Sequence, residues 1–225
     1  MRGNADDGPL LNLLDRTAVA EQRVFTNPTD PSYDSDYHTI EIAGNRRFHD
    51  NWMLLTSFEY TWLKNFFNNT SSTSSAGIAA GNTKDFLWQP NQRRFGRETA
   101  TIWNYKIVGR YVPAWDIGIS GSYKLQSGRQ WGRSISVTLP VAGSETIRVE
   151  PITANRAPPV AIFDVRLDKS FRFVGRTRLV GMLDMFNLTN SGVPVNFQTA
   201  SAVSFKEVTS LLDPRIVRLG VRFEF

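Results

Sequence analysis

Three charged residues at alternate positions, Asp164, Arg166 and Asp168, are the group in this sequence that comes nearest to a chemical site. In an extended strand all three side chains point to one side, because successive side chains alternate between the two faces. Two carboxylates on one face could serve as the acid and base of a hydrolase. The arginine between them instead favours a charge ladder in which the carboxylates are neutralised. We therefore expect a structural ladder and no catalytic residue.

The sequence contains neither a cluster of metal-ligating residues nor a motif for a catalytic nucleophile. The chain of 225 residues has no cysteine and two histidines, His38 and His49, which lie at opposite ends of one predicted strand. Two residues so far apart on an extended strand cannot share a metal ion. No HExxH, Walker or nucleophile-elbow motif occurs. The sequence predicts a protein that is not an enzyme and that uses no metal or cofactor.

Charge and hydropathy argue against a nucleic-acid-binding protein and against a protein with transmembrane helices. The chain has 26 Lys and Arg against 21 Asp and Glu, a net charge of +5, and these residues are scattered singly, which argues against a nucleic-acid partner. Mean hydropathy is -0.29, and no stretch approaches the 18 apolar residues of a transmembrane helix. Membrane strands remain possible, because a strand that alternates keeps a polar average.

Seven stretches alternate between polar and apolar residues and predict long β-strands. They are residues 37–48, 52–65, 98–112, 116–130, 160–173, 177–190 and 214–225. They exceed the ordinary strand of about 5–6 residues, and a tilted membrane strand needs about 9–11. Stretch 177–190 alternates poorly, and Gly181 predicts a bulge there.

The connections between these strands alternate between two kinds. Tight turns are expected at residues 49–51, 113–115 and 174–176, and long loops at 66–97, 131–159 and 191–213. Short turns at one end of every hairpin and long loops at the other are typical of outer-membrane barrels. The predicted fold class is therefore all-β: an antiparallel, up-and-down segment of a transmembrane β-barrel, with short periplasmic turns and long outer loops.

The two faces of the predicted strands differ in character. One face is apolar, with aromatic residues toward both strand ends, as expected for the two water–lipid boundaries. The other face would line the barrel lumen with Glu59, Lys106, Arg110, Lys124, Asp164, Arg166, Arg218 and Arg222. In this arrangement the apolar face contacts outer-membrane lipid.

Several motifs resemble those of TonB-dependent receptors, most closely the Oar-like transporters. The resembling residues are Arg156, Pro158, Asp164, Arg166, Asp168, Lys169, Phe186, Asn187 and Asn190. The final strand looks like the C-terminal signal of outer-membrane barrels, through Val217, Leu219, Val221, Phe223 and Phe225. The likeness covers about residues 36–225. It implies energised uptake of a bulky solute, such as a siderophore, a carbohydrate or a peptide, through the bacterial outer membrane.

The resemblance also implies partners that this sequence lacks. Such receptors have a signal peptide, a TonB-binding segment, a plug domain and a barrel of about 22 strands. We expect residues 36–225 to be the C-terminal strands of such a barrel and residues 1–35 to be the remnant of an outer loop. Its partners would be the barrel-assembly machinery, the upstream strands and the plug, with TonB engaged only through the missing N-terminal part.

One predicted loop could contact the transported solute. The stretch FLWQPNQRRFGR brings Trp88 together with Arg93 and Arg94, which could hold an anionic or sugar-like ligand. The alternative is that these residues anchor the loop to the barrel rim.

Two other kinds of protein are compatible with the same pattern of strands. A free-standing small outer-membrane barrel, such as an adhesin or a porin, would need a further strand within residues 1–35. A soluble β-sandwich binding module would cover the same apolar face with a second sheet.

Overall fold

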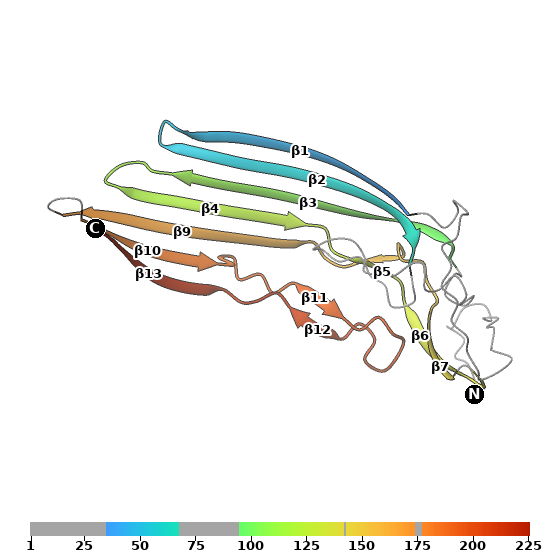
Figure 1. Ribbon diagram of the computed structural model, residues 1–225. Helices are drawn as coiled ribbons and strands as arrows, with labels where there is room; N and C mark the ends of the chain where they lie inside the picture. Colours follow the sequence, from blue (N-terminus) through green and yellow to red (C-terminus); the bar gives the residue numbers. More distant parts are fainter. Residues whose placement is uncertain (1–34, 68–94, 142, 174–176) are drawn as a thin grey trace.

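The computed structural model of this protein describes residues 35–67, 95–141, 143–173 and 177–225. Within these ranges the regular elements are all β-strands. Seven of them form one antiparallel sheet in the order β1-β2-β3-β4-β9-β10-β13 (Figure 1). Their bounds are β1 Asp36–His49, β2 Trp52–Phe66, β3 Arg97–Tyr111, β4 Ile117–Gln126, β9 Val160–Arg172, β10 Arg178–Phe186 and β13 Ile216–Glu224. The predicted all-β, antiparallel, up-and-down arrangement is confirmed for this part of the chain.

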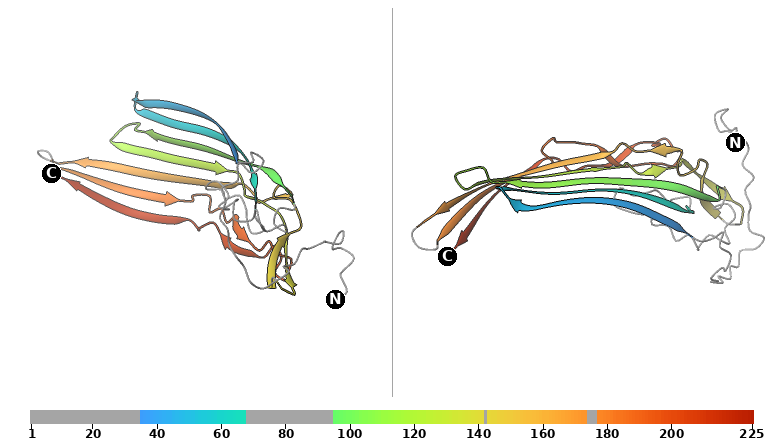
Figure 2. Two further views of the ribbon diagram at one scale, coloured as in Figure 1. Left: turned by 45° about the vertical axis from the view of Figure 1, so that its right-hand side comes forward. Right: turned by 90° about the horizontal axis from the view of Figure 1, so that it is seen from above.

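The sheet is open. Strands β1 and β13 are its two edges, and they lie on opposite sides of the sheet in Figures 1 and 2. The described strands therefore do not close into a barrel by themselves, and the barrel part of the expectation stays a prediction. The described part of the chain contains no helix that could cross a bilayer. Of residues 1–35, predicted to be the remnant of an outer loop, residues 1–34 lie outside the described residues.

Two tight turns join the strands at one end of the sheet. Asp50 and Asn51 between β1 and β2 have φ angles of 50° and 67°. Trp115 and Asp116 between β3 and β4 have φ angles of 57° and 54°. Consecutive left-handed residues match the right-handed twist of hairpin strands, and Asp and Asn tolerate this conformation best. The third predicted turn, residues 174–176, lies outside the described residues.

The predicted bulge at Gly181 is wrong. Strand β10 pairs without a register shift with β9 on one side and with β13 on the other. Two continuous ladders hold the strand in a regular register. The sequence alternates poorly because Val180, Met182 and Phe186 share the face that Asp184 occupies.

The long connections contain short strands that the sequence analysis did not predict. They are β5 Gln130–Trp131, β6 Ser134–Leu139, β7 Gly143–Arg148, β8 Asn155–Arg156, β11 Pro194–Phe197 and β12 Val208–Leu211. These form three two-stranded sheets, β5-β8, β6-β7 and β11-β12. Figures 1 and 2 place them toward the end of the main sheet that is opposite the tight turns, with β11 and β12 following the ends of the shorter strands β10 and β13.

The strand pairings define an apolar face. They align Trp52, Tyr111, Ile119, Leu167, Leu183 and Leu219 in one row across six strands. Most of this row is open to the surroundings, and Leu219 is 80% exposed. The buried core cluster lies elsewhere, at the loop end, and consists of Leu63, Phe67, Ala100 and Ile152. The described residues therefore leave the apolar face without a covering layer.

Candidate functional site

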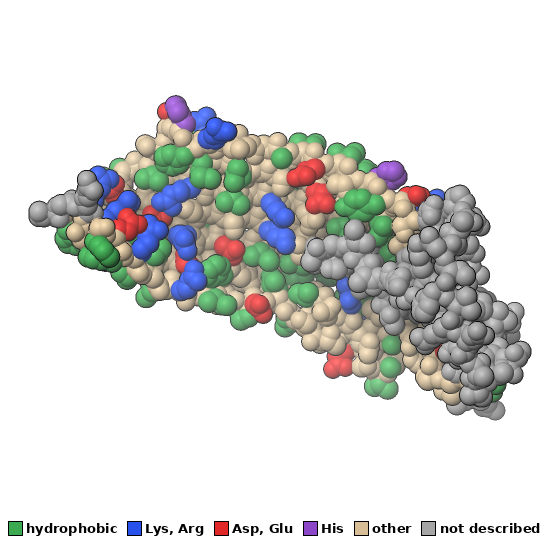
Figure 3. All heavy atoms as spheres, viewed as in Figure 1, with side chains coloured by type: hydrophobic (Ala, Val, Ile, Leu, Met, Phe, Trp, Pro, Cys, Tyr) green, Lys and Arg blue, Asp and Glu red, His purple; other side chains and the backbone are tan. Residues whose placement is uncertain are grey.

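The opposite face, here called the charged face, has a matching row that is polar from β3 to β13 and begins with Met53 on β2. The pairings align Met53, Arg110, Ser120, Arg166, Asp184 and Arg218 across the same six strands. Each of these residues is a sequence neighbour of a member of the apolar row, so the two rows lie back to back. Figure 3 shows acidic and basic side chains gathered over the sheet toward its tight-turn end.

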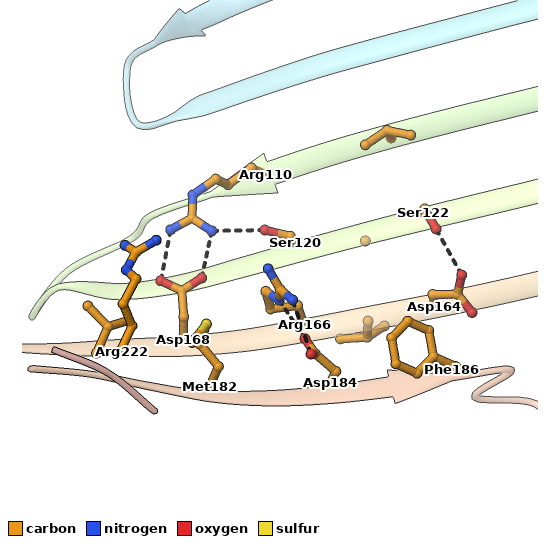
Figure 4. Close-up of a pocket in the computed structure, with 14 residues that line it drawn as sticks. Arg110, Ser120, Ser122, Asp164, Arg166, Asp168, Met182, Asp184, Phe186 and Arg222 are labelled. Carbon is orange, nitrogen blue, oxygen red and sulfur yellow. Dashed lines mark hydrogen bonds and ion pairs between the residues drawn. The ribbon is translucent and has the colours of Figure 1, made fainter. Parts of the chain in front are cut away.

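An ion pair with two hydrogen bonds joins β3 to β9 on the charged face. Arg110 donates from Nη1 and Nη2 to the two carboxylate oxygens of Asp168, over 2.6 and 2.8 Å (Figure 4). Its Nη1 also donates to the Ser120 hydroxyl at 2.9 Å. The Asp168 side chain is only 12% exposed. A forked guanidinium–carboxylate pair is directional, so it holds β3 and β9 in register across β4.

A second carboxylate, Asp184 on β10, accepts hydrogen bonds from two arginines. Arg166 reaches it from β9, with Nε to Oδ1 at 2.5 Å and Nη2 to Oδ2 at 3.0 Å. Arg218 reaches it from β13, with Nε and Nη2 at 2.9 and 2.7 Å from Oδ2. The Asp184 side chain is 7% exposed, whereas those of Arg166 and Arg218 are 43% and 60% exposed. The group carries a net charge of +1, presented outward by the arginines.

A third carboxylate, Asp164, has only uncharged hydrogen-bond donors as its recorded partners. The Ser122 hydroxyl donates to it at 3.3 Å and the Asn187 backbone N–H at 2.9 Å. The Asn187 side chain donates to the carbonyls of Ser191 and Asp213 and accepts from the Ser191 N–H. Its φ of 48° is in the left-handed region, which asparagine tolerates. Asn187 thereby joins the exit of β10, the entry to β13 and, through Asp164, strand β9.

These residues surround a hollow of about 470 Å³ on the charged face (Figure 4). Arg110, Arg166 and Arg222 contribute charge to its lining, while Val108, Val180, Met182 and Phe186 contribute apolar surface. A hollow of this size and mixture can hold a small ligand or a side-chain cluster from another domain. The carboxylates Asp168 and Asp184 are already bound by guanidinium groups, so the arrangement favours binding over proton transfer.

All eight predicted lumen residues lie on this one face. Followed from strand to strand, the pairings place the side chains of these residues on the same side of the sheet: Glu59, Lys106, Arg110, Lys124, Asp164, Arg166, Arg218 and Arg222. The ion pairs group only some of them. Glu59 accepts a hydrogen bond from Thr61 at 3.1 Å, and Arg222 pairs with Glu224 at 2.8 Å.

The three residues of the predicted charge ladder, Asp164, Arg166 and Asp168, lie on this face, but Arg166 forms its hydrogen bonds with another strand. Its partner is Asp184 on the neighbouring strand β10. Direct cross-strand neighbours are closer than residues two apart along a strand. Asp184 was not among the predicted lumen residues because its own stretch alternates poorly. Trp88, Arg93 and Arg94, the predicted solute-binding residues, lie outside the described residues.

A buried ion pair joins the long connection between β4 and β9 to the main sheet. Arg148 at the end of β7 donates to the Glu98 carboxylate of β3, and their side chains are 2% and 7% exposed. Glu98 also accepts from the Ile152 N–H at 2.5 Å, and Arg148 donates to the Phe67 carbonyl at 3.1 Å. Sequence reasoning missed this pair because its members are about fifty positions apart.

The two long loops after β4 and β10 contact each other. Ser134 exchanges backbone hydrogen bonds with Thr199 and Ser201, and the Trp131 ring centroid lies 5.0 Å from that of Phe197. The Arg129 guanidinium stacks over Phe197 at 4.5 Å. Burial lowers the pKa of Arg129, although an arginine stays charged at neutral pH. The loops therefore form one folded unit above the sheet.

Metal-binding geometry is also absent from the described residues, where no three His, Asp or Glu side chains are grouped to hold an ion. Comparison of the chain with models of protein families, with curated proteins and with solved structures finds no match.

Proposed function

We propose that this chain forms the C-terminal wall of a TonB-dependent receptor in the bacterial outer membrane, for energised uptake of a bulky solute. The observation that carries the proposal is the pair of back-to-back rows: an exposed apolar row on one face and an ion-paired polar row on the other. A barrel wall needs these two faces, because lipid covers one and water or a plug domain fills the other.

The strand lengths and aromatic positions support the same placement. Strands β1, β2 and β3 have 14, 15 and 15 residues, more than a bilayer crossing requires. On the apolar face Tyr111 and Phe171 lie exposed at the tight-turn end, with Trp115 in the adjoining turn, and Trp62 lies exposed toward the other end. Aromatic residues at both ends fit the two membrane interfaces.

The open edges favour part of a larger barrel over a free-standing one. Unpaired strand edges are not tolerated in lipid, so β1 and β13 need neighbours. In the proposed receptor these are the upstream strands, with the charged face turned toward the plug. A β-sandwich is less well supported, since no second sheet packs on the apolar face among the described residues.

The placement in the membrane is tested by an epitope inserted into each end. A tag in the β6–β7 turn, after Leu139, should bind antibody on intact cells. A matched tag between Asp50 and Asn51 should bind only after the outer membrane is permeabilised. Recovery of the protein in the soluble fraction, or equal labelling of both tags on intact cells, would contradict the proposal.

Energised uptake is tested separately. A strain lacking this protein should lose growth on one nutrient from a panel of ferric siderophores, oligosaccharides and peptides supplied at limiting concentration. A strain lacking TonB should show the same loss. Membrane insertion with no growth defect on any member would favour the small-barrel alternative.

A further inference from the structure

One charged side chain interrupts the apolar face of β4, β9, β10 and β13. The alternation that places Asp168 on the charged face places Lys169 on the apolar one, between Leu167 and Phe171 along β9. Its cross-strand neighbour on β4 is Ile117. Among the paired residues of these four strands, Lys169 is the only charged residue on this face. An isolated cation in an apolar surface calls for an anionic partner.

The space beside Lys169 is open. Its cross-strand neighbour on β10 is Gly181, which has no side chain. A Cβ atom built on Gly181 would have no atom within 4 Å. The glycine therefore leaves a gap in the apolar face next to the lysine, and this gap is not needed for a turn or a positive φ.

The protein supplies Lys169 with few partners. Its ammonium donates to the Trp115 carbonyl and lies 5.8 Å from the Phe171 ring centroid. The nearby Asp116 carboxylate pairs with Arg172 at 2.7 Å, and no described carboxylate pairs with Lys169. An ammonium has three donors, so donors remain for a ligand.

Lys169 lies near the tight-turn end of the sheet, where a strand of a membrane barrel would meet the membrane–water interface. Its neighbour Ile117 is the first residue of β4, and Trp115 in the adjoining turn is 80% exposed. Long basic side chains near strand or helix ends extend toward lipid headgroups, and tryptophan prefers the same level. Phospholipid phosphates lie there.

We propose that Lys169 and the gap at Gly181 form a binding site for the phosphate of an anionic phospholipid. The phosphate contacts the ammonium, and the acyl chains lie along the apolar row. This inference rests on the membrane placement proposed above, with the tight turns in the periplasm, and it assigns the lipid to the periplasmic leaflet.

The test uses the full-length receptor purified in detergent. Brominated phosphatidylglycerol is compared with brominated phosphatidylcholine by quenching of tryptophan fluorescence. The protein should prefer phosphatidylglycerol, and Lys169→Met should reduce that preference about fivefold, the effect of roughly 1 kcal/mol for one basic residue at a membrane surface. Lys169→Arg should keep most of it. An unchanged preference in Lys169→Met would overturn the proposal.

A second variant separates lipid binding from a merely structural lysine. Gly181→Val fills the gap without touching the contact between Lys169 and Trp115, and the open space allows it to fold. It should also lower the preference for phosphatidylglycerol; full retention would remove the gap from the site. Lys64→Met, on the same face at the other end of β2, should have little effect. Equal losses for Lys64→Met and Lys169→Met would show a general charge effect and refute the site.

The two proposals fail in different ways. A protein that never enters the membrane fraction refutes the receptor proposal and this inference with it. A membrane-inserted protein whose lipid preference ignores Lys169 and Gly181 refutes the lipid site alone.

Discussion

Arg166 on β9 binds Asp184 on β10, its direct cross-strand neighbour, and not the carboxylates of its own strand. Because Arg218 on β13 binds the same carboxylate from the other side, one aspartate links three consecutive strands. Asp168 links its strand to β3 through a single arginine. The three carboxylates of the charged face therefore differ in the number of arginine side chains that bind to them.

That difference gives the first prediction. Asp184→Asn should lower the melting temperature of the folded protein more than Asp168→Asn does, because it removes the hydrogen-bonded carboxylate of two guanidinium groups and Asp168→Asn removes that of one. Circular dichroism of the protein in detergent measures both. Equal shifts would contradict the shared role of Asp184.

The two faces of β13 give a second prediction. Leu219 lies in the exposed apolar row, whereas Gly220 faces Met182, whose Cε would lie 3.5 Å from an added Cβ, an ordinary contact. If the sheet is the proposed barrel wall, Leu219→Arg should cost about 2–4 kcal/mol and reduce the amount of assembled protein, while Gly220→Arg should be milder. Heat-modified migration on gels quantifies assembly. The reverse order would mean that the faces are assigned wrongly.

Asn187 gives a third prediction. Replacing it with glycine keeps the left-handed backbone accessible but removes the side-chain bonds to Ser191 and Asp213. Each lost buried bond costs about 1–3 kcal/mol if its partner stays unsatisfied. We expect faster proteolysis in the connection after β10. Asn190→Gly, which removes one exposed hydrogen bond to the Arg215 N–H, is the matched control and should be milder.

The buried pair of Glu98 and Arg148 gives a fourth prediction. Arg148→Met alone should destabilise the long connection between β4 and β9 by about 3–5 kcal/mol, because it leaves a buried carboxylate without its cation. The double variant Glu98→Leu with Arg148→Met should recover much of the loss. Hydrogen exchange of the β6–β7 hairpin reports it. A double variant as unstable as the single would show that Glu98 matters through its bond to the Ile152 N–H.

Phe225 gives a fifth prediction. It is 97% exposed beyond the last paired residue of β13, and its ring centroid lies 6.1 Å from that of Phe223. If it is read by the assembly machinery as an added strand, deleting it should slow assembly while completed barrels melt almost normally. Phe223→Ala, within the ladder, should instead lower the melting temperature. Normal assembly kinetics with a lowered melting point for the deletion would reject the signal.

The strands and their faces followed from local pattern, as the stretch 160–173 illustrates. Phe163, Val165 and Leu167 alternate there with Asp164 and Arg166, and β9 presents them on opposite faces as predicted. A period of two residues is a property of each strand alone, so it needs no knowledge of neighbours. In the stretch 177–190 the strand was predicted correctly and the bulge at Gly181 was wrong. Its charged-face positions are partly apolar, so the local pattern is weak, and its register is determined by β9 and β13.

The tertiary structure alone decided which side chains meet. Alternation shows that Arg166 and Arg218 share a face, but the ladder register determines that Asp184 lies between them. The pair of Glu98 and Arg148, the contact between the two long loops and the gap beside Lys169 likewise depend on residues from different strands or loops. The face on which a side chain lies follows from its position within its own strand. The register between two strands depends on the hydrogen bonds that join them, and a single sequence contains no direct record of those bonds.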